Sequence, residues 1–167
     1  MTPILETNRL VLREFTVADA EFILKLLNEP SYLKFIGDKG VRTVADAQTY
    51  LTNGPITSYQ KNGFGVYLTA LKENDTPVGM CGLIKRDGLL DVDIGYAFLP
   101  AYWGKGYASE AAEATMVYGK MKLGLERIVG ITAVTNQGSI NVLQKIGLKF
   151  ERMIILPGED EEIMLFG

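Results

Sequence analysis

The 167-residue chain contains no histidine and a single cysteine, Cys81. The absence of histidine excludes a histidine general base, and with it every Ser-His-Asp or Cys-His catalytic arrangement. It also excludes a zinc site built from histidine and cysteine. A lone cysteine cannot form an intramolecular disulfide, which fits a reducing compartment. Any acid–base chemistry must therefore come from carboxylates, tyrosine, lysine, serine or water.

Positive charge is also scarce, because 17 Lys and Arg face 20 Asp and Glu, for a net charge of −3. A mildly acidic chain disfavours nucleic-acid binding, which usually needs a basic surface, and a polybasic membrane anchor. Residues 1–15 carry charges where a signal peptide would be apolar, and the longest uncharged run, residues 128–144, is interrupted by polar side chains. We expect a cytoplasmic protein that folds as one domain over residues 1–167.

Hydrophobic periodicity and turn signals predict a mixed sheet with helices on its faces. The segment 32–40 is predicted to be a loop, and residues 53–55 to end a helix. The expected order is β-α-α-β-β-β-α-β-α-β-β, an α+β fold with a central, mostly antiparallel sheet and no Rossmann topology. Strands are expected at residues 10–15, 65–71, 78–85, 90–98, 127–135, 148–156 and 162–166, and helices at 16–27, 43–51, 106–122 and 136–147, with Thr16, Thr43 and Asn136 at the starts of three of them.

The segment LPAYWGKGYASEA, residues 99–111, places Gly104 and Gly106 around Lys105 ahead of an alanine-rich helix. A Walker A loop is excluded because Gly106, and not Ser or Thr, follows the lysine. A dinucleotide fingerprint fails because Ser109 stands where its third glycine belongs. An anion-binding turn remains, since two glycines allow positive φ and the first helical amides are free donors. The alternative is a plain strand-to-helix turn.

Three segments in order resemble the GNAT N-acetyltransferases. The first is the loop 103–108, which is similar to that family's acyl-CoA loop, Gln/Arg-x-x-Gly-x-Gly/Ala. Gly106 and Ala108 match it, whereas Trp103 stands where Gln or Arg is usual, a departure typical of the branch resembling ribosomal-protein alanine N-acetyltransferases. The segments 136–148 and 7–13 are similar to two further blocks of that branch.

The resemblance implies a GNAT-like acyl-CoA N-acyltransferase fold in which two strands splay apart. It implies acetyl-CoA as co-substrate, with its pyrophosphate on the glycine loop and its pantetheine in the split, and no metal. Gly95, in the strand before the loop, is a plausible bulge position. The cofactor-binding residues that the resemblance implies are Tyr96, Ala97, Phe98, Trp103, Gly104, Lys105, Gly106, Tyr107, Ala108, Ser109, Asn136 and Asn141.

The candidate catalytic residues are Asp93 and Ser139. Strand alternation puts Asp91 and Asp93 on one face, and Asp93 is close to the position where the family carries a base or a water-holding acid. Its alternative is a solvated polar face. Ser139 matches a serine of the branch and could protonate the leaving thiolate, or it could be an ordinary first-turn serine. Leu143 stands where many relatives carry a tyrosine for that step.

Two further sites stay open at the level of sequence. Glu110 is either a base or a favourable charge in the first turn of its helix. For the acceptor, Tyr32 and Phe35 are candidate substrate-binding residues together with Asp91, although apolar loop residues also pack against a sheet.

We expect acetyl transfer to a primary amine by direct attack in a ternary complex. At pH 7 a lysine amine of pKa about 10.4 is neutral in roughly 1 of 2,500 molecules, and an α-amine of pKa about 7.8 in roughly 1 of 7. A protein or peptide N-terminal α-amine therefore asks less of a carboxylate base. The alternatives are a small-molecule amine (a polyamine, an antibiotic or an amino acid) and a non-catalytic acyl-CoA-binding sensor. A homodimer is compatible with the sequence, which does not define the oligomeric state.

Overall fold

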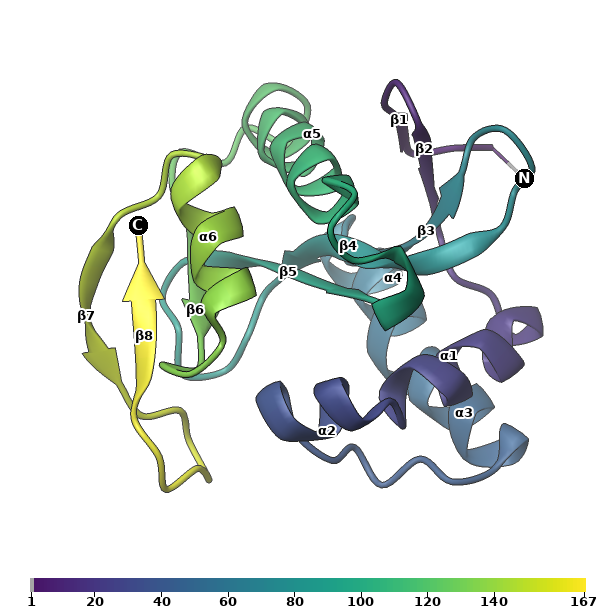
Figure 1. Ribbon diagram of the computed structural model, residues 1–167, viewed down its shortest axis with the longest axis horizontal. Helices are drawn as coiled ribbons and strands as arrows, with labels where there is room; N and C mark the ends of the chain where they lie inside the picture. The colour runs from purple at the N-terminus through teal and green to yellow at the C-terminus, as the bar shows by residue number, and fades with distance from the viewer. Residues whose placement is uncertain (1) are drawn as a thin grey trace.

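The computed structural model describes residues 2–167, which form one eight-stranded sheet (Figure 1). Among the described strands, β5 and β6 pair in parallel and the other neighbours pair antiparallel. The mostly antiparallel sheet expected from the sequence is therefore confirmed. Across the sheet the order is β1 (Leu5–Glu6), β2 (Leu10–Arg13), β3 (Val66–Leu71), β4 (Pro77–Ile84), β5 (Val92–Phe98), β6 (Ile128–Thr132), β8 (Ile163–Phe166) and β7 (Phe150–Ile154).

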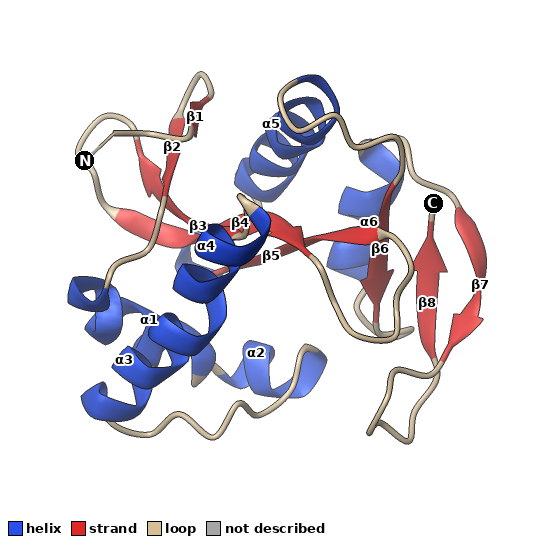
Figure 2. Ribbon diagram, turned by 180° about the vertical axis from the view of Figure 1, so that it is seen from behind, coloured by secondary structure: helices blue, strands red, loops and turns tan. Residues whose placement is uncertain are grey.

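The helices form two layers, one on each face of the sheet (Figures 1 and 2). The first layer comes from the N-terminal third of the chain, and the second comes from the segments on either side of β6. No helix in the part of the chain that the structure describes is long and apolar enough to cross a membrane. The first layer holds η1 (Val17–Asp19), α1 (Ala20–Leu27), α2 (Pro30–Phe35), α3 (Val44–Leu51), η2 (Thr52–Ile56) and α4 (Thr57–Asn62), and the second holds α5 (Tyr107–Met121) and α6 (Gln137–Lys145), with the short turn η3 (Pro100–Tyr102) before α5.

Helix starts follow the capping residues of the sequence. Thr16 and Thr43 each accept a backbone hydrogen bond in a capping box, before η1 and α3 respectively. Asn136 caps α6 by accepting from the Ser139 amide at 3.1 Å. Such caps contribute about 1 kcal/mol each, because they satisfy amides that the helix itself leaves unpaired.

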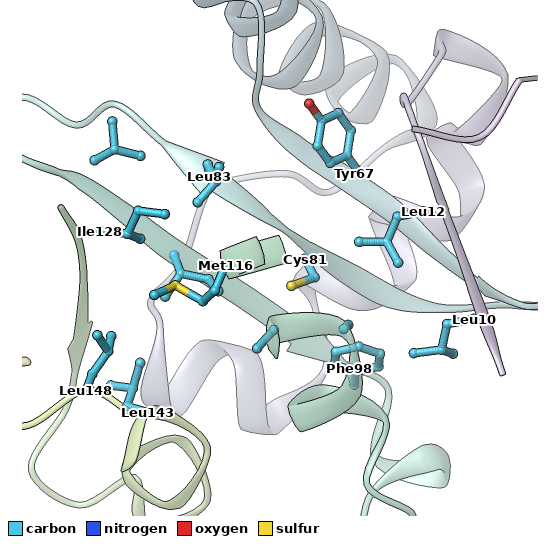
Figure 3. Close-up of a cluster of buried hydrophobic side chains, with 14 of the residues drawn as sticks. Leu10, Leu12, Tyr67, Cys81, Leu83, Phe98, Met116, Ile128, Leu143 and Leu148 are labelled. Atoms are coloured by element: carbon cyan, nitrogen blue, oxygen red, sulfur yellow. The ribbon is translucent and has the colours of Figure 1, made fainter. Parts of the chain in front are cut away.

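The core beneath α5 and α6 explains the small residues of α5. Ala111, Ala112 and Thr115 are fully buried, so the helix backbone lies close to β4 and β5. Figure 3 shows Cys81 within this core, near Met116 of α5. The Cys81 Sγ atom lies 3.4 Å from Thr115 Oγ1, and burial raises the pKa of the thiol to about 12. Cys81 is thus a structural residue, because a thiol of that pKa is not a nucleophile at neutral pH.

Two sequence-based predictions in the first helical layer were wrong. The segment 32–40 was expected to be a loop, but α2 covers Pro30–Phe35, with Pro30 in the first turn, where a missing N–H leaves no helical hydrogen bond unmade. Residues 53–55 were expected to end a helix, yet the chain continues from α3 through the wide turn η2 into α4 with Pro55 buried inside it. Proline has no backbone N–H to donate to the preceding helical turn. The wider π-type turn accommodates this missing hydrogen bond, so the helix continues through Pro55.

Candidate active site

β5 and β6 separate halfway along β5. They pair from Val92 opposite Ile128 to Ile94 opposite Gly130, after which β5 continues to Phe98 without β6. The expected bulge at Gly95 was wrong, because Gly95 stays in regular register with Gly82 of β4. Gly95 is instead the residue at which pairing with β6 stops. The expected splay between the two strands is therefore present.

The split exposes backbone hydrogen-bonding groups of β5. The Leu99 amide donates to Val78 of β4, so Tyr96 and Phe98, which alternate with it, direct their backbone groups toward the split. The Phe98 carbonyl accepts from the Trp103 indole Nε1 at 2.8 Å. Ala97 lies between them and directs its groups toward β4. An extended ligand that carries amides can pair here with Tyr96 and with the Phe98 amide, as an added strand would.

The turn after β5 leads into a helix start that has no cap. Gly104 and Gly106 have φ of +75° and +82°, the left-handed region that the paired glycines suggested. No side chain caps α5, in contrast to η1, α3 and α6. Among residues 2–167, no acceptor meets the six successive amides of residues 104–109. Six unpaired donors at the positive end of a 15-residue helix can hold an anion, and residues 104–109 are called the anion cradle below.

The side chains of this loop divide between support and solvent. Trp103 is half-exposed, and its indole ties the turn to the end of β5 through the Phe98 carbonyl. Lys105 is exposed and Tyr107 is half-buried. The anion cradle is therefore made by the backbone, and Trp103 fixes its position relative to the split.

Tyr96 and Ser139 meet across the split. The Tyr96 hydroxyl lies 3.0 Å from the Ser139 carbonyl oxygen and 3.0 Å from Ser139 Oγ. Because a carbonyl only accepts, Tyr96 donates to it, and the Ser139 hydroxyl can donate to the Tyr96 oxygen. Burial raises the pKa of Tyr96, so the phenol keeps its proton at neutral pH. The expected position of the missing tyrosine, Leu143, is fully buried against Gly130, and Asn141 is exposed and bonded to Gln137.

Asp93 is buried, on the face of β5 that points away from Tyr96. Its two carboxylate oxygens accept from Arg86 Nε and Nη2, each at 3.2 Å, while its side chain is 1% exposed. Burial raises the pKa of Asp93, and the adjacent guanidinium opposes that rise. The alternative of a solvated polar strand face is therefore excluded for Asp93. Asp91 is separate, because it pairs with Arg127 at 3.0 Å.

Two tyrosines of the first helical layer are within range of the charge of Arg86. Burial raises the pKa of Tyr32 in α2 and of Tyr50 in α3, and the charge of Arg86 opposes that rise at both phenols. Phe35 is half-buried beneath Lys34, whose ammonium lies 5.0 Å from the ring centroid. Sequence reasoning missed Arg86 and Tyr50. The hairpin register was the available signal for Arg86, since Ile84 opposite Asp93 brings residue 86 within reach of that carboxylate.

Glu110 is held by two residues of the turn between β1 and β2. Its carboxylate accepts from Thr7 Oγ1 at 2.5 Å and from Arg9 Nε at 2.8 Å. Burial acts to raise the pKa of Glu110, but these hydrogen bonds outweigh it and lower the pKa. A carboxylate that is held ionised by two donors is a poor base. The structure therefore favours the alternative of a structural first-turn charge.

Comparison with known proteins defines the class. Residues 9–149 match the family model described as "Acetyltransferase (GNAT) domain", so the chain belongs to the GNAT acetyltransferase family. The chain is 32% identical over 145 residues to YnaD of Bacillus subtilis, named an uncharacterized N-acetyltransferase, covering 87% of this chain and 82% of that protein. A GNAT-family acetyltransferase from Bacillus anthracis superposes with a TM-score of 0.79 at 28% identity, over 97% of this chain and 95% of the other.

More distant structures share the fold and differ in the substrates that their names state. RimL, described as a ribosomal L7/L12 α-N-protein acetyltransferase in complex with coenzyme A, has a TM-score of 0.80 at 16% identity over 99% of this chain and 96% of its own. A spermidine N-acetyltransferase SpeG chimera from Vibrio cholerae and hSSAT has 0.75 at 17% identity, over 94% and 93%. At these identities the likeness shows the fold alone. The GNAT family uses acetyl-CoA and acts on amine acceptors, and the uncapped cradle fits the phosphates of that co-substrate.

Proposed function

We propose that this protein transfers the acetyl group of acetyl-CoA directly to a primary amine, and that its preferred acceptor is the N-terminal α-amine of a protein or peptide. The observation that carries the proposal is the row of six unpaired amides at residues 104–109, next to the split between β5 and β6. The amides hold the diphosphate, and the backbone of Tyr96 and Phe98 holds the pantetheine. Asn136, the N-cap of α6, and Asn141, in the middle of that helix, are further proposed ligands of the co-substrate.

Asp93 is the proposed proton acceptor for the acceptor's ammonium, through a bound water. Its raised pKa strengthens it as a base, and Arg86 keeps it ionised. The co-substrate supplies an acetyl group activated as a thioester. As the nitrogen–carbon bond forms, the carbon–sulfur bond breaks. Asp93 passes the ammonium proton to bulk water before the attack and takes the second proton from nitrogen as the new bond forms. Ser139 donates its hydroxyl proton to the sulfur, and the proton on Asp93 returns to the Ser139 oxygen through water.

Tyr32, Phe35 and Asp91 are the proposed walls of the acceptor site. Tyr32 has the best support, because the charge of Arg86, the partner of the proposed base, acts on its phenol. A carboxylate base suits an α-amine better than a lysine amine, since the α-amine is neutral far more often at pH 7. This is the reason for preferring a peptide N-terminus. A cytoplasmic location stays a prediction from the sequence.

The test is release of free thiol from acetyl-CoA against a panel of peptides with free N-termini, polyamines, aminoglycosides and amino acids. We expect turnover with the peptides, and Asp93→Asn to lower kcat at least 100-fold. Asp87→Asn is the matched control, an exposed carboxylate in the same hairpin, and should leave kcat unchanged. Turnover of polyamines alone would contradict the α-amine assignment. If the protein binds coenzyme A but releases no thiol from acetyl-CoA with any amine of the panel, it is a sensor.

A further inference from the structure

Arg9, in the turn between β1 and β2, lies beside the anion cradle, although it is about 100 residues away in the sequence. Figures 1 and 2 both show the β1–β2 turn alongside α5. The Arg9 guanidinium carbon lies 4.4 Å from the centroid of the Tyr107 ring, in the first turn of α5. A Cβ placed on Gly106 would be 3.4 Å from Arg9 Nη2. The guanidinium therefore borders the unpaired amides of residues 104–109.

Only part of the Arg9 hydrogen-bonding capacity is used. Its Nε donates to Glu110 Oε1 at 2.8 Å, and its backbone amide donates to Glu110 Oε2 at 3.0 Å. Within residues 2–167, Nη1 and Nη2 donate to no acceptor, and the side chain is 42% exposed. Glu110 and the Tyr107 ring thus fix the plane of the guanidinium and leave its outer edge open. That edge has the geometry that binds phosphate oxygens in pairs.

Two cations lie beside the positive end of α5. The N-terminus of a helix carries a partial positive charge, so a cation beside it is unfavourable unless an anion is also present. Arg9 is paired with Glu110, which lines one hollow with Glu6 and Glu113, whereas Lys105 is exposed in the loop itself. A diphosphate bound at the free amides would give both cations a negative partner.

We propose that Arg9 binds the diphosphate of the co-substrate through Nη1 and Nη2, and so links the N-terminal hairpin to the cradle on α5. The inference rests on the proposed function, which puts a diphosphate on residues 104–109. It adds a side-chain ligand from a different part of the chain to a site otherwise built from backbone amides. The Glu110 carboxylate and the Tyr107 ring act as positioning groups, because they hold the Arg9 guanidinium.

The test compares two variants that break the same ion pair from opposite sides. Arg9→Met keeps an unbranched apolar side chain over the Tyr107 ring and removes the guanidinium. Glu110→Gln keeps Arg9 and removes the negative charge of the carboxylate. Calorimetric titration with coenzyme A should show about a tenfold higher Kd for Arg9→Met, the lower end of the range for a charge-assisted contact, as suits a partly exposed group. Glu110→Gln should bind as tightly as the wild type or more tightly. Arg152→Met, on the exposed strand β7, controls for net charge.

Dephospho-coenzyme A, which lacks the 3′-phosphate, identifies the group that Arg9 contacts. Arg9→Met should weaken it by the same factor as coenzyme A, and added salt should reduce that factor. An effect that disappears with dephospho-coenzyme A would place Arg9 on the 3′-phosphate and overturn the proposal. If Arg9→Met and Glu110→Gln weaken coenzyme A binding equally, the Arg9–Glu110 pair has only a structural role, and the proposal is overturned as well. A wild-type protein that binds no coenzyme A would refute the proposed function itself, whereas an unchanged Arg9→Met Kd would refute only this inference.

Discussion

Replacing Arg86 by methionine should raise the pKa of Asp93 and shift the acid limb of the pH–activity profile to higher pH. Burial already raises the pKa of Asp93, and the charge and hydrogen bonds of Arg86 oppose that rise. Methionine fills a similar volume and removes the charge. Burial then acts unopposed, and Asp93 holds its proton to a higher pH.

The size of the shift follows from the geometry. Opposite charges about 4 Å apart attract by about 4 kcal/mol at an effective dielectric constant of about 20. The Arg86 side chain is 32% exposed, so solvent screens part of this attraction. If screening halves the attraction, about 2 kcal/mol remains, which corresponds to a rise of about 1.5 units in the pKa of Asp93 at 1.36 kcal/mol per unit. The acid limb of kcat/KM should move up by about that amount.

Protein stability should change with pH in the same sense. A carboxyl whose pKa is higher in the folded state than in the unfolded state loses stability as pH rises from about 4 to the folded pKa. In Arg86→Met the folded pKa is higher still, so this loss extends over about 1.5 further units. The variant should therefore be more destabilised at pH 8 than at pH 5, by about 2 kcal/mol in the free energy of unfolding measured with urea.

The double variant Arg86→Met/Asp93→Asn is the control for this effect. It lacks the titrating carboxyl, so the difference in the free energy of unfolding between the double variant and Asp93→Asn should not depend on pH. An acid limb that stays at the wild-type pH in Arg86→Met would refute the assignment of Asp93 as the titrating base. A destabilisation that is equal at pH 5 and pH 8 would show that the charge of Arg86 does not act on Asp93.

Three further predictions concern the cradle, the first helical layer and the core. Gly106→Ala and Gly124→Ala each force a side chain into positive φ, so both should lose about 1 kcal/mol of stability, but calorimetry should show weakened coenzyme A binding for Gly106→Ala alone. Hydrogen bonds from Arg13 and Thr16 outweigh burial and lower the pKa of Asp19, so the wild type loses stability as pH falls below about 4. Asp19→Asn should remove this part of the difference in the free energy of unfolding between pH 7 and pH 3, measured with urea. A variant whose difference between the two pH values equals that of the wild type would contradict this. Leu143→Ala should lower the free energy of unfolding by about 3 kcal/mol, since Leu143 is fully buried against Gly130, and a loss below about 1 kcal/mol would mean that the site collapses around the smaller residue.

Most of the element order was predictable because its signals are local, although β1, α2 and α4 were not expected. Thr16, Thr43 and Asn136 mark helix starts through hydrogen bonds within three residues of themselves. The β3–β4–β5 meander follows from alternating apolar residues separated by turn residues. The cradle was predictable for the same reason, since positive φ at a glycine pair and free amides at a helix start are properties of adjacent residues.

Local signals failed where packing overrode them. Pro55 was expected to end a helix, yet it lies buried in the turn η2 that continues from α3 into α4. Gly95 looked like a bulge because glycine weakens a strand, but its lack of a side chain serves a close approach, since a Cβ there would be 2.7 Å from Ile84 Cδ1. The sequence around a glycine or proline does not show which residues pack against it in space, and those residues decide its structural role.

By itself, the sequence determined most of the order of elements, the glycine turn before α5 and, through the lack of histidine, that no histidine can act as the base. Only the tertiary structure decided which charges act together. Arg9 reaches the cradle from the N-terminal hairpin, Arg86 clamps Asp93 across a β-hairpin, and Tyr96 meets Ser139 across the split. The physical reason is that backbone conformation depends on neighbours in the chain, whereas pKa values and ligand contacts depend on neighbours in space, which the sheet and its two helical layers bring together.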